Sequence, residues 1–310
     1  MDMIWVVVLF AMGAVAGSFA CCQAVRFAHL ANFEPKSALR ARRNSNTHAS
    51  SSSTSTSNLT QICKSNRSHC LSCGYQLKWY DNIPIVSWVV LGGRCRKCGK
   101  SIGWWEIGSE VGLGVAFVGF GMWFVGALGR DLAGGYGVEV VHTIKAWVMV
   151  GLAILMLVGF AILFISDARW GKLPVRYLVF CVVCAALFVI VREWGVVFAV
   201  GKWSVYAYDR IWGYLGALAV LPALYYLLYK VSGERWVGSG DWLLALPMAL
   251  VLGDFWLAFF CLFVANLLGC LVMVPVMKVK KKNTNMRIPF GPFLIAAFVV
   301  VFLCQDLIRN

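Results

Sequence analysis

The apolar residues of this chain gather in blocks of about twenty, which is the length that a helix needs to cross a hydrocarbon core of ~30 Å. We therefore predict an all-α polytopic membrane protein with about eight transmembrane helices. The sixth block is short, and it meets the seventh at Gly253-Asp254, where we predict a tight turn. The predicted spans are residues 3–22, 111–128, 146–165, 177–191, 211–229, 242–254, 256–277 and 290–305.

The composition supports this interpretation. Apolar residues make up 60% of the 310 residues and charged residues only 14%, whereas an average globular chain carries roughly 25% charged residues. The mean hydropathy is +0.75. These values exclude a water-soluble enzyme, a disordered chain and a secreted disulfide scaffold. The 14 Trp, 10 Tyr and 20 Phe suit membrane interfaces, where amphipathic rings settle.

The net charge of +14 is unevenly distributed. If the N-terminus lies outside, the predicted inner loops 23–110, 166–176, 230–241 and 278–289 hold 22 of the 28 Lys and Arg residues. An excess of these residues marks cytoplasmic loops. The charge therefore serves as a topology signal and attracts anionic lipid, and we do not expect nucleic acid as a partner.

Three parts follow from this topology. Residues 1–22 form a first anchor, which we expect to be retained because no basic stretch precedes it as in a signal peptide. Residues 23–110 form a cytoplasmic loop, and residues 111–310 form a membrane region of seven helices. Within the loop, residues 44–57 are almost entirely Ser, Thr and Asn, so we predict a flexible insert there.

The loop also contains two Cys-x-x-Cys pairs within residues 70–98, separated by 21 residues. Two turns of this kind can present four thiolates to one tetrahedral Zn²⁺ ion. We predict a structural zinc site at Cys70, Cys73, Cys95 and Cys98, with a redox pair as the alternative. A third such pair, Cys181 and Cys184, lies inside an apolar span, where Cys is expected to act as a small hydrophobic residue.

Acidic residues in or near membrane spans are costly, so they are candidate functional groups. Counting the spans places Asp167 and Asp241 at the same depth on one side and Asp254 on the other. Two neighbouring carboxylates share a proton, so that one can activate water while the other protonates a leaving group. We therefore predict Asp167 and Asp241 as catalytic residues. Gly238 and Gly240 lack Cβ atoms and would allow close approach to the second carboxylate. The alternative is that Asp241 simply caps its helix.

At these residues the chain resembles the bacterial prepilin peptidases, also called type IV leader peptidases, which are GxGD aspartic proteases. The chain departs from the family's pattern at two positions: Cys21 stands where the family commonly has Asn, and Leu243 stands where it usually has Lys. The motifs that carry the resemblance are Gly17-Ser18-Phe19 with Arg26, the cysteine loop including residues 79–84, Glu110, Asp167 with Leu173-Pro174, Gly233 with Gly238-Ser239-Gly240-Asp241, and residues 288–293.

This resemblance implies an enzyme of the bacterial inner membrane that cuts type IV prepilins, or pseudopilins of type II secretion, after a Gly at the cytoplasmic face. Many members then methylate the new N-terminal residue with S-adenosylmethionine, an activity associated with the large loop. Two alternatives remain open. One is a multi-pass transporter whose acidic residues bind cations, and the other is a non-catalytic assembly protein of a secretion system.

Overall fold

The computed structural model describes residues 3–30, 68–70, 72–133, 140–199, 205–233, 238–279 and 289–309. Within these ranges the chain is mostly helical and forms no strand, as predicted; the cysteine loop has two isolated bridges, between His69 and Gln76 and between Arg94 and Ser101. The predicted flexible insert 44–57 lies outside the described residues.

Six helical segments in the described part are long and apolar enough to cross a membrane, which makes this a multi-pass membrane protein. Each of them overlaps a predicted span and most extend past it, because a helix can continue into the polar interface beyond its apolar block. The segments lie in α1 (Met3–Leu30), α5 (Trp104–Ala133), α6 (Val140–Trp170), α7 (Val175–Ala199), the continuous run α8 (Val205–Leu218), η2 (Ala219–Ala223) and α9 (Leu224–Ser232), and α11 (Phe255–Val279).

The remaining two predicted spans are the shorter apolar helices α10 (Asp241–Leu252) and α12 (Gly291–Leu303), and a last short helix, α13 (Gln305–Arg309), follows them. A helix of 12 residues is about 18 Å long, less than the ~30 Å of a hydrocarbon core. The predicted turn between α10 and α11 is confirmed. Gly253 has a left-handed φ of 57°, and Asp254 then accepts hydrogen bonds from the N–H groups of Trp256 (2.8 Å) and Leu257 (3.1 Å).

The chain divides into two compact units. Unit 1 comprises Met1–Val118 and Ala168–Lys172, and so contains α1, the cysteine loop with η1 (Trp79–Asn82) and α4 (Val86–Val90), and the first half of α5. Inside unit 1, α1 and α5 approach closely at glycines. A Cβ atom on Gly13 would lie 2.6 Å from the carbonyl oxygen of Leu113 and 2.7 Å from the Cα of Gly114. Small residues at these positions let two membrane helices pack backbone to backbone.

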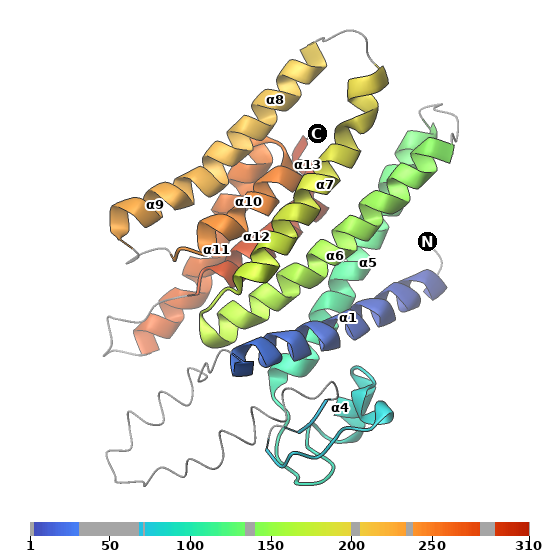
Figure 1. Cartoon of the computed structure of the whole chain (residues 1–310), viewed down its shortest axis with the longest axis vertical. Helices are drawn as coiled ribbons and strands as arrows, with labels where there is room; N and C mark the ends of the chain where they lie inside the picture. Colours follow the sequence, from blue (N-terminus) through green and yellow to red (C-terminus); the bar gives the residue numbers. More distant parts are fainter. Residues whose placement is uncertain are drawn as a thin grey trace. The chain divides into compact units, whose positions relative to one another are not determined.

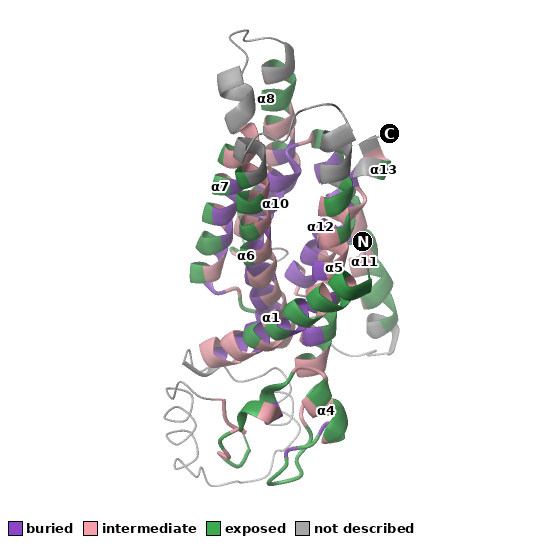
Figure 2. Ribbon diagram, turned by 90° about the vertical axis from the view of Figure 1, so that its right-hand side faces the viewer, coloured by how far each residue is buried: buried purple, intermediate pink, exposed green. Residues whose placement is uncertain are grey.

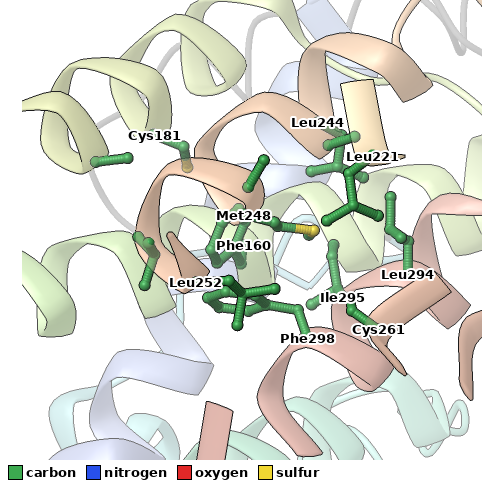
Figure 3. Packing of buried hydrophobic residues seen from close by; sticks show 14 of the residues in the cluster. Phe160, Cys181, Leu221, Leu244, Met248, Leu252, Cys261, Leu294, Ile295 and Phe298 are labelled. Carbon is green, nitrogen blue, oxygen red and sulfur yellow. The ribbon is translucent and has the colours of Figure 1, made fainter. Parts of the chain in front are cut away.

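Unit 2 comprises Gly119–Asp167 and Leu173–Asn310. Its core surrounds α10, which packs against α7, α8, η2, α9 and α12 (Figure 1). Buried residues concentrate on α10 and α12, while the outer faces of the longer helices are exposed (Figure 2). Figure 3 shows Met248 of α10 and Leu221 of η2 in the same buried cluster as Phe160 of α6 and Phe298 of α12. The ring centroids of the two phenylalanines are 5.3 Å apart.

The C-terminal end of α10 is held by Arg192 of α7. Its guanidinium donates hydrogen bonds to the carbonyl oxygens of Val251 (2.7 Å) and Leu250 (3.5 Å), which have no partner further along the helix. Arg192 also donates to the hydroxyl of Tyr214, which in turn donates to Glu193 at 2.8 Å. This network ties α7, α8 and α10 together and so limits how far Asp241, at the other end of α10, can move.

Candidate active site and metal centre

Asp167 lies near the C-terminal end of α6 and is only 5% exposed. Its Oδ2 atom accepts a hydrogen bond of 3.1 Å from the N–H of Gly291, the first residue of α12. A Cβ atom on Gly291 would stand 2.7 Å from that oxygen. Glycine is therefore needed at residue 291 for the backbone to come this near to the carboxylate.

Asp241 is the first residue of α10 and is 9% exposed. Its Oδ2 atom accepts the N–H of Gly238 at 3.0 Å, so this carboxylate turns back onto the preceding loop. The N-cap residue of α10 is Gly240, which has no side chain that could cap the helix. Asp254 behaves differently, because its carboxylate accepts the first N–H groups of α11 and acts as an ordinary helix cap.

Two contacts bring the segments that carry Asp167 and Asp241 together within unit 2. A Cβ atom on Gly240 would lie 2.8 Å from Cδ1 of Leu173, so the segment after α6 packs directly on the loop before Asp241. A Cβ atom on Gly291, which is bonded to Asp167, would lie 3.3 Å from Cδ2 of Leu244, one helical turn after Asp241. Gly240 is thus in close contact with the Leu173 side chain, and Asp254 lies at the other end of α10.

The structure adds polar groups that the sequence did not single out. Among the described residues, the buried hydroxyls of Ser166 and Tyr225 have no hydrogen-bond partner. Ser166 precedes Asp167, and the ring of Tyr225 lies 5.6 Å from that of Phe290, the residue before Gly291. These two hydroxyls are therefore buried polar groups on or beside the segments that meet Asp167. In the sequence, only the position of Ser166 directly before Asp167 could have pointed to one of these two hydroxyls.

The four loop cysteines come together, as predicted. The sulfur atoms of Cys70, Cys73, Cys95 and Cys98 all lie within 4.8 Å of one another, and those of Cys70 and Cys98 are 3.9 Å apart. A tetrahedral ion with metal–sulfur bonds of about 2.3 Å requires sulfurs about 3.8 Å apart. All four are free thiols, so this cluster can hold a metal ion.

Both cysteine pairs sit on the same type of turn. Gly74 donates its N–H to the carbonyl of Cys70, and Gly99 donates to that of Cys95, each at 2.9 Å. The two glycines have φ values of 69° and 66°, a left-handed conformation that favours glycine. The repeated pattern is thus Cys-x-x-Cys-Gly, and the glycine after each pair is the sequence signal for this turn.

The thiols of the cluster ionise unequally. The backbone N–H groups of Cys98 and Lys97 lower the pKa of Cys95 to about 7. At Cys73 the N–H of Tyr75 favours the thiolate, but desolvation and the neighbouring thiols outweigh it and raise the pKa to about 11. A cation bound here must therefore displace protons from the cluster, which makes its affinity dependent on pH.

Glu110, one of the residues that carry the resemblance to the prepilin peptidases, links the cysteine loop to α5. Its Oε2 atom accepts the N–H of Ile85 at 2.7 Å, and Ile85 has an unusual positive φ of 62°. Within the loop, Asp81 pairs with Arg96 at 3.0 Å.

Cys181 and Cys184 are buried in α7, in accordance with their predicted role as small hydrophobic residues.

Comparisons with known proteins find similarity over much of the chain. Residues 11–124 match the family model described as bacterial peptidase A24 N-terminal domain. A prepilin leader peptidase/N-methyltransferase of Stutzerimonas stutzeri is 25% identical over 77% of this chain and 72% of its own length, and that of Pseudomonas aeruginosa is 25% identical over 78% and 73%. The Myxococcus xanthus protein of the same name is 56% identical over 36 residues, 12% of this chain and 11% of its own. No solved structure matches the chain significantly.

Proposed function

Because the chain belongs to the bacterial prepilin peptidase family, we propose that it is an aspartic endopeptidase of the bacterial inner membrane. It removes the leader peptide from type IV prepilins or pseudopilins by cutting after a Gly at the cytoplasmic face. The observation that carries this proposal is that two buried carboxylates, Asp167 and Asp241, lie on segments packed against each other through Leu173, Gly240 and Gly291.

The proposed chemistry uses the two carboxylates with one proton between them. The ionised carboxylate takes a proton from a water molecule while the water oxygen attacks the scissile carbonyl carbon. The protonated carboxylate donates to the nitrogen of the leaving amine as the C–N bond breaks, which leaves a carboxylate on the leader and a free amine on the mature chain. The N–H groups of Gly291 and Gly238 hold one oxygen of each carboxylate in place.

The surroundings of the site suit a substrate that is itself an apolar helix with a polar leader. Asp167 ends an apolar helix and Asp241 begins one, so a scissile bond at the head of a substrate helix would reach them at the membrane boundary. Gly238 and Ser239 are exposed, while the Asp241 carboxylate behind them is buried. Water and the leader can thus approach from the loop side, which the charge distribution predicts to be cytoplasmic.

Replacing the two aspartates tests this assignment. Asp167→Asn and Asp241→Asn each keep the shape of the side chain and remove its acid–base function, so each is expected to lower the rate of prepilin cleavage by about 10²–10⁴-fold. The measurement is cleavage of a full-length prepilin by purified protein in detergent. Asp254→Asn is the matched control, since Asn also caps helices and cleavage should persist. Near-normal cleavage by Asp167→Asn or by Asp241→Asn contradicts the proposal. If the unaltered protein conducts cations and cleaves no prepilin, the transporter alternative is favoured instead.

A second prediction concerns the glycine beside Asp167. Gly291→Ala would place a methyl group 2.7 Å from the carboxylate oxygen, so Asp167 must shift, and the cleavage rate should fall by at least about tenfold. Gly269→Ala is the control, because a Cβ atom there meets Phe290 at an ordinary 3.7 Å. Thermal unfolding of both variants separates a local effect from loss of fold. Equal cleavage by the two folded variants would mean that the contact between Gly291 and Asp167 is unimportant.

We also propose that Cys70, Cys73, Cys95 and Cys98 hold a structural Zn²⁺ ion. Four thiolates occupy all positions of a tetrahedral ion, so the metal would fold the loop and take no part in cleavage. Metal analysis of the purified protein should give about one zinc per chain, lost in Cys73→Ser and Cys98→Ser. Cys270→Ser, at an exposed cysteine of α11, should keep its zinc. Full zinc content in Cys73→Ser or Cys98→Ser would refute the site.

We further propose that the mature N-terminus is methylated with S-adenosylmethionine as donor, because the relatives are named N-methyltransferases as well as leader peptidases. The methyl group would pass from the sulfonium to the amine nitrogen, which loses a proton. Running the cleavage reaction with a methyl-labelled donor should put label on the mature pilin. Complete cleavage without any label would show that this chain is a peptidase alone.

A further inference from the structure

The short helix α4 turns three valines outward from unit 1. Val86, Val89 and Val90 are 54%, 61% and 74% exposed, and their spacing of i, i+3 and i+4 places them on one face of the helix. Solvated loops seldom present β-branched apolar side chains in this way, and a helix of five residues cannot span a membrane. This apolar face therefore needs another explanation.

The structure holds α4 beside the starting turn of a membrane helix. Trp104 is the first residue of α5 and is 77% exposed, in a position typical of the aromatic residues that settle at membrane interfaces. The ring of Trp88, from α4, lies 5.3 Å from the ring of Trp104. Trp88 also packs on Gly93, where a Cβ atom would stand 2.9 Å from its ring. The contact between Trp88 and Trp104 therefore joins α4 to the first turn of α5. Figure 1 shows α4 near the lower end of α5.

The exposed charge of the cysteine loop is positive, while the Glu110 carboxylate that accepts the N–H of Ile85 before α4 is buried. The cysteine loop from residue 72 to residue 103 contains a single acidic residue, Asp81, which is buried and paired with Arg96. Its basic residues are all exposed at the surface, and they are Lys78, Arg94, Arg96, Lys97 and Lys100. An apolar face set in a basic surface is the pattern of a segment that binds anionic lipid, because the valines can enter the acyl boundary while the cations meet the headgroups.

We propose that α4 is an interfacial helix, which inserts Val86, Val89 and Val90 into the anionic surface of the same membrane that α5 crosses. The bilayer thereby becomes a third support of the cysteine loop, beside the four-cysteine cluster and the hydrogen bond from Ile85 to Glu110. This inference goes beyond the peptidase activity, since lipid contact at α4 does not depend on whether Asp167 and Asp241 cleave a substrate.

Photo-crosslinking in the full-length protein tests the contact directly. The protein carries p-benzoylphenylalanine at Val90, or at Ser72 as an exposed control on the first cysteine turn, and is placed in nanodiscs of phosphatidylethanolamine and phosphatidylglycerol. After illumination, intact-mass analysis should find about tenfold more lipid adduct at residue 90 than at residue 72. Equal adducts at both positions, no adduct at residue 90, or cross-links from residue 90 to a second copy of the chain would overturn the proposal.

Hydrogen exchange of the unaltered protein gives a second, independent readout. The amides of Val89 and Leu91 are bonded only within this short helix, so they should exchange quickly unless lipid covers them. Exchange should slow by about tenfold in discs that contain phosphatidylglycerol relative to discs of phosphatidylcholine alone, and Val89→Asp combined with Val90→Asp should abolish the difference. Equal exchange of the unaltered protein in the two kinds of disc would overturn the assignment of an anionic surface.

Discussion

A short helix enclosed by membrane helices must have its terminal backbone groups satisfied by protein, because the hydrocarbon around the bundle offers no water. Helix α10 meets this constraint at its C-terminal end through Arg192, which donates to the carbonyls of Leu250 and Val251. At its N-terminal end the backbone N–H of Asp241 donates to the carbonyl of Gly238 at 3.2 Å, and the N–H of Gly238 donates to the Asp241 carboxylate. The candidate active site depends on this arrangement, because α10 carries Asp241 and is packed against several neighbouring helices.

Glycines allow the closest contacts between neighbouring segments of this protein. Gly240 admits Leu173 and Gly291 admits Asp167, so the two aspartate segments share one packed layer in unit 2. The same principle operates in unit 1, where Gly13 lets α1 touch the backbone of α5. Helices in lipid gain little from excluding water between them, and close packing through small residues is what remains to hold them together. The geometry of the candidate site and the association of helices thus rely on the same residue type.

The two kinds of support for the function concern different parts of the chain. The family match covers residues 11–124, which include most of α1, the cysteine loop and the first part of α5, whereas Asp167 and Asp241 lie beyond it. The relatives extend the similarity to about three quarters of the chain. The packing of the aspartate segments is seen in the structure itself, independently of either comparison. An enzyme that both cleaves and methylates would need both parts, a carboxylate pair and a folded loop.

The amino-acid sequence by itself determined the helices, the four-cysteine cluster and the candidate aspartates. Apolar blocks can only be helical in lipid, and each Cys-x-x-Cys-Gly turn is built by a few neighbouring residues. The short sixth block was already visible in the sequence, but the tertiary structure alone decided that Arg192 secures α10 and that Gly291, 124 residues from Asp167, donates to its carboxylate. These features depend on which helix faces which, and apolar periodicity records that a face is buried without recording its partner.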